Sequence, residues 1–201
     1  EEYTFPAPEA ETRRSSIVEF LKRHEKIVLK PVANGSSIGL YIVDQQKALE
    51  EALVKIKTAN LGDYIAEKVI AGRELTVGVY QSTKGIIPLP PSEVIMNQGR
   101  SFDYEGKYLG HGTTEITPAQ LTPDETKKAQ RMALEAHQAL NCYGYSRTDL
   151  ILTTEGPVYL ETNTLPGLSK ASFLPQQLKA AEISFSDFVQ RQLELAEKRV
   201  K

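Results

Sequence analysis

The sequence predicts an α+β fold. Short apolar runs with strand-like composition alternate with amphipathic segments at helical spacing, and turns of only a few residues separate some neighbouring runs, as in antiparallel hairpins. The 201 residues are 40% hydrophobic and 25% charged, which is typical of a globular protein long enough to bury a core. The formal net charge of -2 offers no basic field, so we expect no nucleic-acid partner.

The cysteine content and the length of the apolar runs limit the cellular compartment in which we expect the protein. Cys142 is the only cysteine, which excludes an intramolecular disulfide and favours a reducing, cytoplasmic location. No apolar run approaches the roughly 18 residues of a membrane-spanning helix, so we expect no membrane partner. The acidic start EEYTFPAPEA differs from a signal peptide and lacks an initiator methionine, so we expect a piece of a longer chain.

The first half of the chain reads as strands around one helix. Residues 25–31 form a short apolar run that a proline ends, and residues 39–43 form a second run after a Gly-Ser-rich loop. A helix is expected from residue 44 onwards, because apolar residues recur there at helical spacing. The strands expected at 63–70 and 74–81 are joined either by a hairpin or by a bend between two lobes.

The second half begins with a proline-broken strand over residues 84–95, expected at a sheet edge. Residues 97–120 are rich in glycine and lack periodicity, so we expect a lid-like loop there. A helix follows, with Thr122 as N-cap and Glu125 completing a capping box. The last expected elements are strands over 147–153 and 157–162 and a helix over 185–200 that buries Phe188, Val189, Leu193 and Ala196.

The hairpin between the last two strands decides whether a metal site exists. If the loop TEG has three residues, Thr153 pairs with Pro157, and Asp149 lies opposite Glu161 on the face that also carries Asn163. A loop of two residues would move Asp149 to the other face. Facing carboxylates repel, and a divalent cation such as Mg²⁺ would offset that repulsion. A solvated face without metal is the alternative.

Two further stretches suit a nucleotide. Lys30 precedes the loop VANGSSIG, whose N–H groups and hydroxyls can contact phosphates, although most loops of this composition are only turns. In EKVIAGRE, the carboxylates of Glu67 and Glu74 can accept hydrogen bonds from an exocyclic amine and from ribose hydroxyls. A charged hairpin rim is the alternative interpretation of this stretch.

In their order, six stretches between about Glu25 and Pro175 resemble the D-alanine–D-alanine ligase family of ATP-grasp enzymes. These are KPVANGSSIG, EKVIAGREL, PLPPSEV, FDYEGKY, SRTDL and LETNTLPGLSKASF. The resemblance implies two α+β lobes, residues 1–74 and 75–201, that clasp ATP between antiparallel sheets. It also implies that residues 97–120 form the omega loop of the family.

The resemblance implies roles in nucleotide binding. Lys30 would contact the α- and β-phosphates and Lys107 the terminal phosphate. Glu67 would bind the adenine amine, the backbone of Ile70 the ring edge, and Glu74 the ribose. The nucleotide-binding residues implied in this way are Lys30, Ser37, Glu67, Lys68, Ile70, Glu74 and Lys107.

The resemblance also implies a reaction centre. Arg147 would stabilise the transferring phosphoryl group, Gly167 would donate its N–H to the oxyanion, and Ser172 would hold the carboxylate of the second substrate. Phe173 stands where the family usually has leucine, so the shape of this pocket differs from the usual one. The implied catalytic residues are Ser36, Tyr108, Arg147 and Gly167, the substrate-binding residues Ser172 and Phe173, and the metal ligands Asp149, Glu161 and Asn163.

The implied reaction is a two-step ligation in peptidoglycan synthesis. ATP phosphorylates the carboxylate of one D-alanine, and the amine of a second attacks the acyl phosphate, with Mg²⁺ as cofactor and Mn²⁺ as its alternative. Family members carry an N-terminal lobe, expected in cis or in trans, and a homodimer is one expected assembly. Two other functions stay open: a nucleotide-binding module without ligase activity, and a ligase with D-lactate or D-serine as acceptor. Tyr108 favours the dipeptide-forming members.

Overall fold

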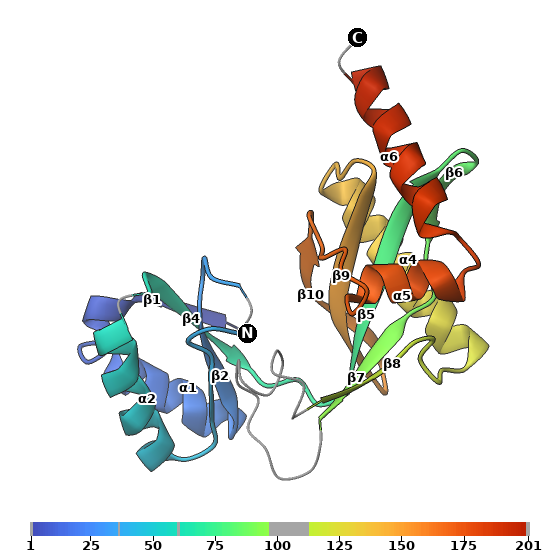
Figure 1. Cartoon of the computed structure of the whole chain (residues 1–201). Coiled ribbons are helices and arrows are strands. Elements are labelled where there is room, and N and C mark those ends of the chain that lie inside the picture. The colour runs from blue at the N-terminus through green and yellow to red at the C-terminus, as the bar shows by residue number, and fades with distance from the viewer. Residues whose placement is uncertain (1, 36, 60, 97–112, 200–201) are drawn as a thin grey trace. The chain divides into compact units, whose positions relative to one another are not determined.

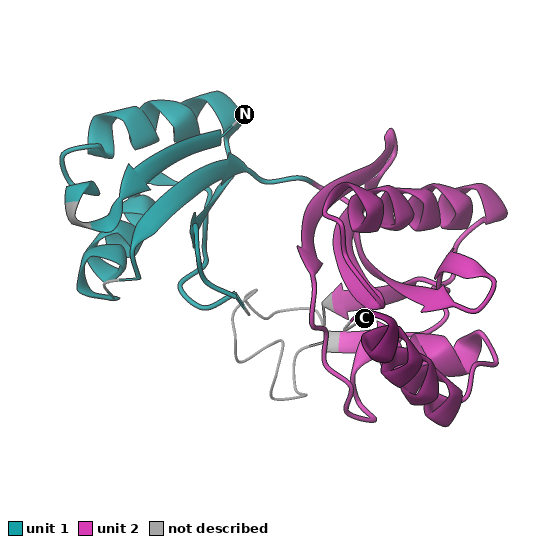
Figure 2. Ribbon diagram, turned by 90° about the horizontal axis from the view of Figure 1, so that it is seen from above, with its two compact units in different colours: residues 1–70, 96–113 teal, residues 71–95, 114–201 magenta. Residues whose placement is uncertain are grey.

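The computed structural model describes residues 2–35, 37–59, 61–96 and 113–199. The chain divides into two compact units (Figures 1 and 2). Unit 1 comprises Glu1–Ile70 and Met96–Thr113, and unit 2 comprises Ala71–Ile95 and Thr114–Lys201. Each unit contains an antiparallel sheet with helices, so the predicted α+β class is confirmed. The functional division into lobes after Glu74 stays a prediction.

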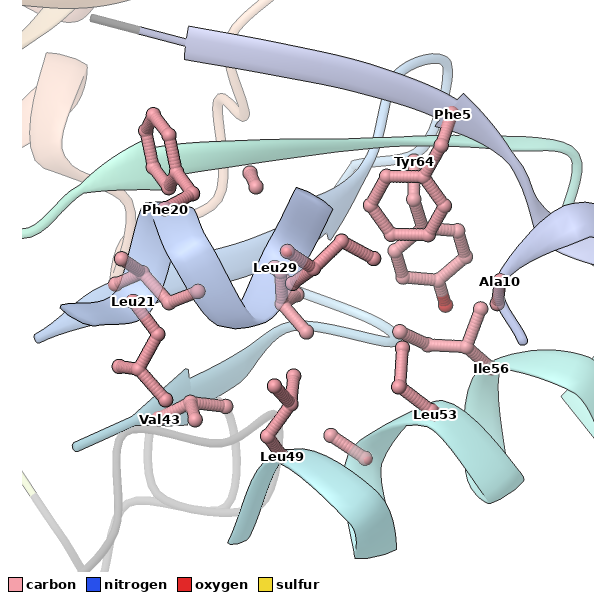
Figure 3. Close-up of a cluster of buried hydrophobic side chains, with 14 of the residues drawn as sticks. Phe5, Ala10, Phe20, Leu21, Leu29, Val43, Leu49, Leu53, Ile56 and Tyr64 are labelled. Carbon is pink, nitrogen blue, oxygen red and sulfur yellow. The ribbon is translucent and has the colours of Figure 1, made fainter. Parts of the chain in front are cut away.

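Unit 1 is a four-stranded antiparallel sheet covered by two helices. The strand order is β1-β4-β2-β3. Apolar residues spaced three and four apart in α1 and α2 face the sheet, and the core includes Phe5, Leu29, Leu49 and Tyr64, each at most 1% exposed (Figure 3). The elements are β1 (Glu2–Pro6), η1 (Ala7–Glu9), α1 (Arg14–His24), β2 (Ile27–Pro31), β3 (Tyr41–Val43), α2 (Gln46–Ala59) and β4 (Asp63–Lys68).

The sheet of unit 1 has a second face that the helices leave uncovered. Side chains alternate between faces along a strand, and Ile27, Leu29 and Pro31 of β2 are buried towards the helices. Val28 and Lys30 therefore lie on the opposite face, together with Ile65 and Glu67 of β4. The register of β2 and β4, which pairs Val28 with Glu67 and Lys30 with Ile65, places these four side chains next to one another.

Unit 2 is built around a six-stranded sheet. Its strand order is β10-β9-β5-β7-β8, with β6 also paired to β5. Helix α4 packs on one face against residues such as Leu75 and Leu150, whereas α5 and α6 share a second core with Tyr80 and Leu89. The elements are β5 (Arg73–Ser82), β6 (Gly85–Pro88), β7 (Ser92–Met96), β8 (Thr113–Ile116), α4 (Pro123–Ala139), β9 (Tyr145–Thr153), β10 (Gly156–Asn163), α5 (Phe173–Ala180) and α6 (Phe185–Arg199).

Several local predictions are settled by this topology. Strands β4 and β5 belong to different sheets, so the segment between them is a bend between units and not a hairpin. Prolines divide 84–95 into β6 and β7. In the described pairings β6 pairs only with β5, so it is an edge strand as expected, whereas β7 lies between β5 and β8 and is not. The capping box of α4 is present, with Thr122 N–H donating to Glu125 Oε2 over 2.7 Å. Strand β1, helix α1 and helix α5 were not among the predicted elements.

Two predictions in the second half need correction or fall outside the structure. Residues 97–112, which include Lys107 and Tyr108, lie outside the described residues, and Thr113–Ile116 is strand β8 and not part of a loop. In α6, Phe188 is buried as expected, but Val189 is 38% and Leu193 57% exposed. The reason is that Arg191 donates to the carbonyls of Gln81 and Ser82, which turns the Leu195 side of the helix inwards and leaves Ala196 exposed too.

Among the helices in the described part of the chain, none combines the length and the apolar character needed to cross a membrane.

Candidate functional site

The β9–β10 hairpin sets the register of the candidate metal site. Thr153 pairs with Gly156 and not with Pro157, so the loop has two residues and the predicted three-residue loop is wrong. Gly156 takes a φ of +131°, and Thr153 Oγ1 donates to its carbonyl over 2.8 Å. Continued without interruption, this register would place Asp149 opposite Leu160.

A β-bulge restores the pairing that the site needs. The register shifts between Tyr159 and Glu161, so Leu160 is the extra residue of the bulge. After the bulge, Glu161 pairs with Asp149 and Asn163 pairs with Arg147. The predicted juxtaposition of Asp149 and Glu161 is confirmed, although the bulge and not the loop produces it.

Asp149 is surrounded by hydrogen-bond donors. Arg147 donates from Nε to Oδ1 and from Nη2 to Oδ2, both over 3.0 Å, and each of the two side chains is 20% exposed. Asn163 Nδ2 donates to Asp149 Oδ2 over 3.2 Å and lies 3.4 Å from Glu161 Oε1. Thr76 Oγ1, from β5, also donates to Asp149. Within the protein, Arg147 and Asn163 therefore offset the repulsion between the two carboxylates.

This donor set suits a hard divalent cation that shares its ligands with a phosphate. Asp149 and Glu161 supply two carboxylates on one face, and Asn163 can add an amide oxygen. No group of three or more His, Cys, Asp or Glu side chains that could hold a metal occurs within residues 2–35, 37–59, 61–96 and 113–199. A closed all-protein cage is therefore not built here, whereas Mg²⁺ commonly takes one or two carboxylates plus phosphate oxygens.

The predicted acceptor residues lie beside Arg147. Its guanidinium stands 5.7 Å from the ring centroid of Phe173, the first residue of α5. Ser172 is the N-cap of α5, but among the described residues its hydroxyl caps no backbone N–H and contacts Ser169 Oγ at 2.9 Å. Gly167 approaches so closely that a Cβ there would lie 2.8 Å from Ser172 Oγ. Unit 2 thus brings Arg147, Gly167, Ser172 and Phe173 towards one end of α5.

The predicted nucleotide residues are divided between the units. In unit 1, Lys30 Nζ and Glu67 form an ion pair at 2.5 Å on the uncovered face of the sheet, with both side chains about one-third exposed. Lys68 ends β4, and Ile70 is 38% exposed just beyond it. Ser37 lies in unit 1 with a φ of +57°, and Glu74 lies in β5 of unit 2, whereas Ser36 is outside the described residues.

Two residues near the site were not predicted. Thr76 could have been found, because strand alternation puts it on the same face as Glu74, and in the sheet it pairs directly with Asp149. Gln177 of α5 is fully buried and hydrogen-bonded to β5, and no local pattern in the sequence predicts this burial.

Solved structures share this fold. The crystal structure of VanG D-Ala:D-Ser ligase from Enterococcus faecalis is 27% identical with a TM-score of 0.79, covering 97% of this chain and 56% of that chain. D-alanine–D-alanine ligase from Bacillus anthracis complexed with ATP is 25% identical with a TM-score of 0.74, covering 98% of this chain and 61% of that chain. The class is therefore the ATP-grasp fold, as the resemblance implied.

Sequence comparison identifies the family within that class. Residues 9–194 match the family described as D-ala D-ala ligase C-terminus. D-alanine–D-alanine ligase of Leptospira interrogans is 39% identical over 175 residues, 85% of this chain and 49% of the relative. That of Syntrophobacter fumaroxidans is 42% identical over 173 residues, 85% of this chain and 54% of the relative. The chain belongs to the D-alanine–D-alanine ligase family, and it spans about half the length of the curated relatives it matches.

Proposed function

We propose that the chain is the ATP-grasp part of an ATP- and Mg²⁺-dependent ligase that joins two D-alanines for peptidoglycan synthesis, with Mn²⁺ as the alternative metal. The observation that carries the proposal is the face of Asp149, Glu161 and Asn163 beside Arg147. Membership of the family and the ATP complex of the Bacillus anthracis relative support the nucleotide.

The uncovered face of unit 1 suits the base and phosphates of ATP. Val28 and Ile65 offer apolar surface beside Lys30 and Glu67. An ion pair that is about one-third exposed contributes about 0–1 kcal/mol, so Lys30 can leave Glu67 for the phosphates at little cost. Glu67 then accepts from the adenine amine. Lys68, the backbone of Ile70 and the hydroxyl of Ser37 are the further contacts we assign in unit 1, and the carboxylate of Glu74 in unit 2 binds ribose.

The reacting groups belong to unit 2. Asp149, Glu161 and the amide oxygen of Asn163 would hold Mg²⁺, which supplies positive charge against the phosphate oxygens when bound. Arg147 has a guanidinium that is fixed by Asp149 on one side and by the Phe173 ring on the other. A cation held in place in this way can stabilise charge that develops on a transferring phosphoryl group without reorganising.

The start of α5 suits the carboxylate of the second amino acid. The first N–H groups of a helix lack partners within the helix and carry partial positive charge, which favours an anion. Ser172 can turn its hydroxyl to the same carboxylate, because it is not used as a cap. Gly167 lies beside Ser172 and has no side chain to screen its N–H, so it can donate to the oxyanion.

The activity of the whole protein depends on parts beyond this chain. The matches cover about half of the length of these relatives, and we propose that an N-terminal lobe, in cis or in trans, completes the site of the first D-alanine. We expect the 201 residues alone to bind Mg-ATP and hydrolyse it slowly, because an incomplete site does not exclude water. The omega loop with Lys107 and Tyr108, over residues 97–120, stays a prediction.

One second candidate has a specific observation in its favour. The Enterococcus faecalis neighbour is named a D-Ala:D-Ser ligase, so D-serine is the alternative acceptor, with D-lactate as a further one. Phe173 lies at the acceptor end and is the residue whose replacement should change acceptor preference. The other alternative is that the chain is a nucleotide-binding module without ligase activity. It is excluded if the chain, mixed with an N-terminal lobe, releases ADP only when D-alanine is present.

Calorimetry of ATP binding tests the proposal. Wild type should bind ATP much more tightly with Mg²⁺ than with a chelator, and Glu161→Gln should lose most of that difference. Glu155→Gln is the matched control, because it removes a carboxylate from the loop of the same hairpin. Equal affinity of the wild type with and without Mg²⁺ would exclude the metal assignment.

A further inference from the structure

The amide of Gln177 is fully buried between α5 and the sheet of unit 2. Its Nε2 donates to the Thr76 carbonyl over 2.8 Å and to Ser92 Oγ over 3.0 Å. Its Oε1 accepts from the backbone N–H of Gly78 over 2.9 Å. The side-chain amide thus makes three hydrogen bonds, all of them to β5 and β7. A buried polar group that is hydrogen-bonded in this way fixes the position of its helix.

Gln177 occupies a gap in the strand ladder of β5. In the pairings that the structure describes, β5 is bonded to β7 through Glu74–Thr76 and to β6 through Val79–Ser82. Gly78 belongs to neither pairing. Its carbonyl accepts from the Leu89 N–H over 2.7 Å, and the Gln177 side-chain amide bonds the Gly78 N–H and the Thr76 carbonyl. A Cβ at Gly78 would lie 2.6 Å from Gln177 Oε1 and 2.6 Å from Leu174 Cδ1, so glycine is required there.

Helix α5 and Thr76, which Gln177 connects, also contact the candidate metal site. Thr76, whose carbonyl accepts from Gln177, donates its hydroxyl to the Asp149 carboxylate. Phe173 lies one turn before Gln177 on the same side of α5, and its ring lies against the guanidinium of Arg147. A shift of α5 along the sheet would therefore disturb Asp149 through Thr76 and Arg147 through Phe173.

We propose that Gln177 is a positioning residue. It fixes α5 to β5, so that Asp149 and Arg147 on the phosphate side keep a constant spacing from Ser172 on the acceptor side. The inference rests on the proposed function, since the spacing matters only if this face binds a metal and a phosphate. Partners of metal ligands typically change metal affinity by about 10–100-fold when they are replaced.

The test compares ATP affinity with Mg²⁺ and with a chelator in the 201-residue chain and its variants. Gln177→Leu removes the amide, and Gly78→Ala displaces it. Thr76→Val removes only the hydroxyl that contacts Asp149, whereas Thr76→Ser retains that hydroxyl. Ser146→Ala is the control for lost stability, because it deletes an equally buried hydrogen bond, to His137, on the α4 face. Hydrogen exchange at the Gly78 amide reports on the Gln177 contact without any ligand.

We expect the Mg²⁺-dependent increase in ATP affinity to fall by about tenfold or more in Thr76→Val, which removes a direct partner of Asp149. It should also fall, by a smaller factor, in Gln177→Leu and Gly78→Ala, which act on Asp149 only through Thr76. Thr76→Ser and Ser146→Ala should keep it, and affinity without Mg²⁺ should stay within twofold throughout. Exchange at Gly78 should accelerate in Gln177→Leu. Wild-type Mg²⁺ dependence in Gln177→Leu would overturn this inference alone, whatever the result for Thr76→Val. A wild type with no Mg²⁺ dependence would refute the proposed function as well.

Discussion

Replacing Arg147 by methionine should destabilise unit 2 in the absence of divalent cations and make its stability depend on Mg²⁺. The change removes two charge-assisted hydrogen bonds to Asp149, both 3.0 Å long, at a site where the two side chains are 20% exposed. It also leaves Asp149 facing Glu161 without the guanidinium that neutralises Asp149. Hydrogen bonds to charged groups are worth about 1.5–3 kcal/mol, and like charges directly opposite in a sheet add a further cost.

The size of the expected effect follows from these contacts. Because the site is partly exposed, we expect a total loss of roughly 2–3 kcal/mol, which is about 8–24 °C in the melting temperature of a domain of about 100 residues. A divalent cation can replace the lost charge, so Mg²⁺ should restore part of the stability of Arg147→Met without any nucleotide.

Differential scanning calorimetry in chelator and in Mg²⁺ measures both effects. Arg131→Met is the control, because Arg131 pairs with Glu135 on the exposed side of α4, where such pairs contribute about 0–1 kcal/mol. Arg147→Lys retains the charge but not the two-pronged contact, so it should lie between wild type and Arg147→Met. If Arg147→Met has the same melting temperature as the wild type and Mg²⁺ does not raise it, repulsion between Asp149 and Glu161 is not the force that this site must offset.

Two further predictions concern stability. Gly39→Ala should destabilise unit 1 by about 1–3 kcal/mol, because Gly39 has a φ of +77° and a Cβ would lie 2.6 Å from Leu61 Cδ1. Gly35→Ala should be nearly neutral in urea unfolding, because a Cβ there would meet no atom of the described residues within 4 Å beyond its chain neighbours. Burial lowers the pKa of His137 below its usual 6.5, so the unfolded state takes up its proton first: the stability of unit 2 should be fully present above pH 6.5 and fall as the pH decreases below it. His137→Asn should flatten that decrease in calorimetric scans between pH 7 and 5. An unchanged slope in His137→Asn would show that another group is responsible.

The face of the candidate metal site could be predicted from the sequence, but its construction could not. Strand alternation places Glu161 and Asn163 together, and glycine at 156 marks the end of a turn. The bulge at Leu160 has no local signal, because the extra residue is accommodated through pairing with β9, a contact between separate segments. The predicted register was correct at Asp149 because two deviations, a shorter loop and one extra residue, cancel.

The remaining errors have the same origin in contacts between distant segments. The apolar period of α6 predicts a face with Val189 and Leu193, yet Arg191 hydrogen-bonds the last two carbonyls of β5 and the helix buries Leu195 in place of that face. Gln177 looks like an ordinary polar helix residue until β5 is placed against α5. The capping box of α4, by contrast, was predicted correctly because all its contacts lie within four residues.

The most direct test of the central claim is to locate the metal. Mn²⁺ broadens the NMR signals of nuclei near it, and it is the alternative metal for this site. With ATP and substoichiometric Mn²⁺, amide signals around Asp149, Glu161 and Asn163 should broaden first in the wild-type chain and should be spared in Glu161→Gln. Broadening centred on other residues, or equal broadening in Glu161→Gln, would contradict the assignment of this face as the site where a metal meets the phosphates of ATP.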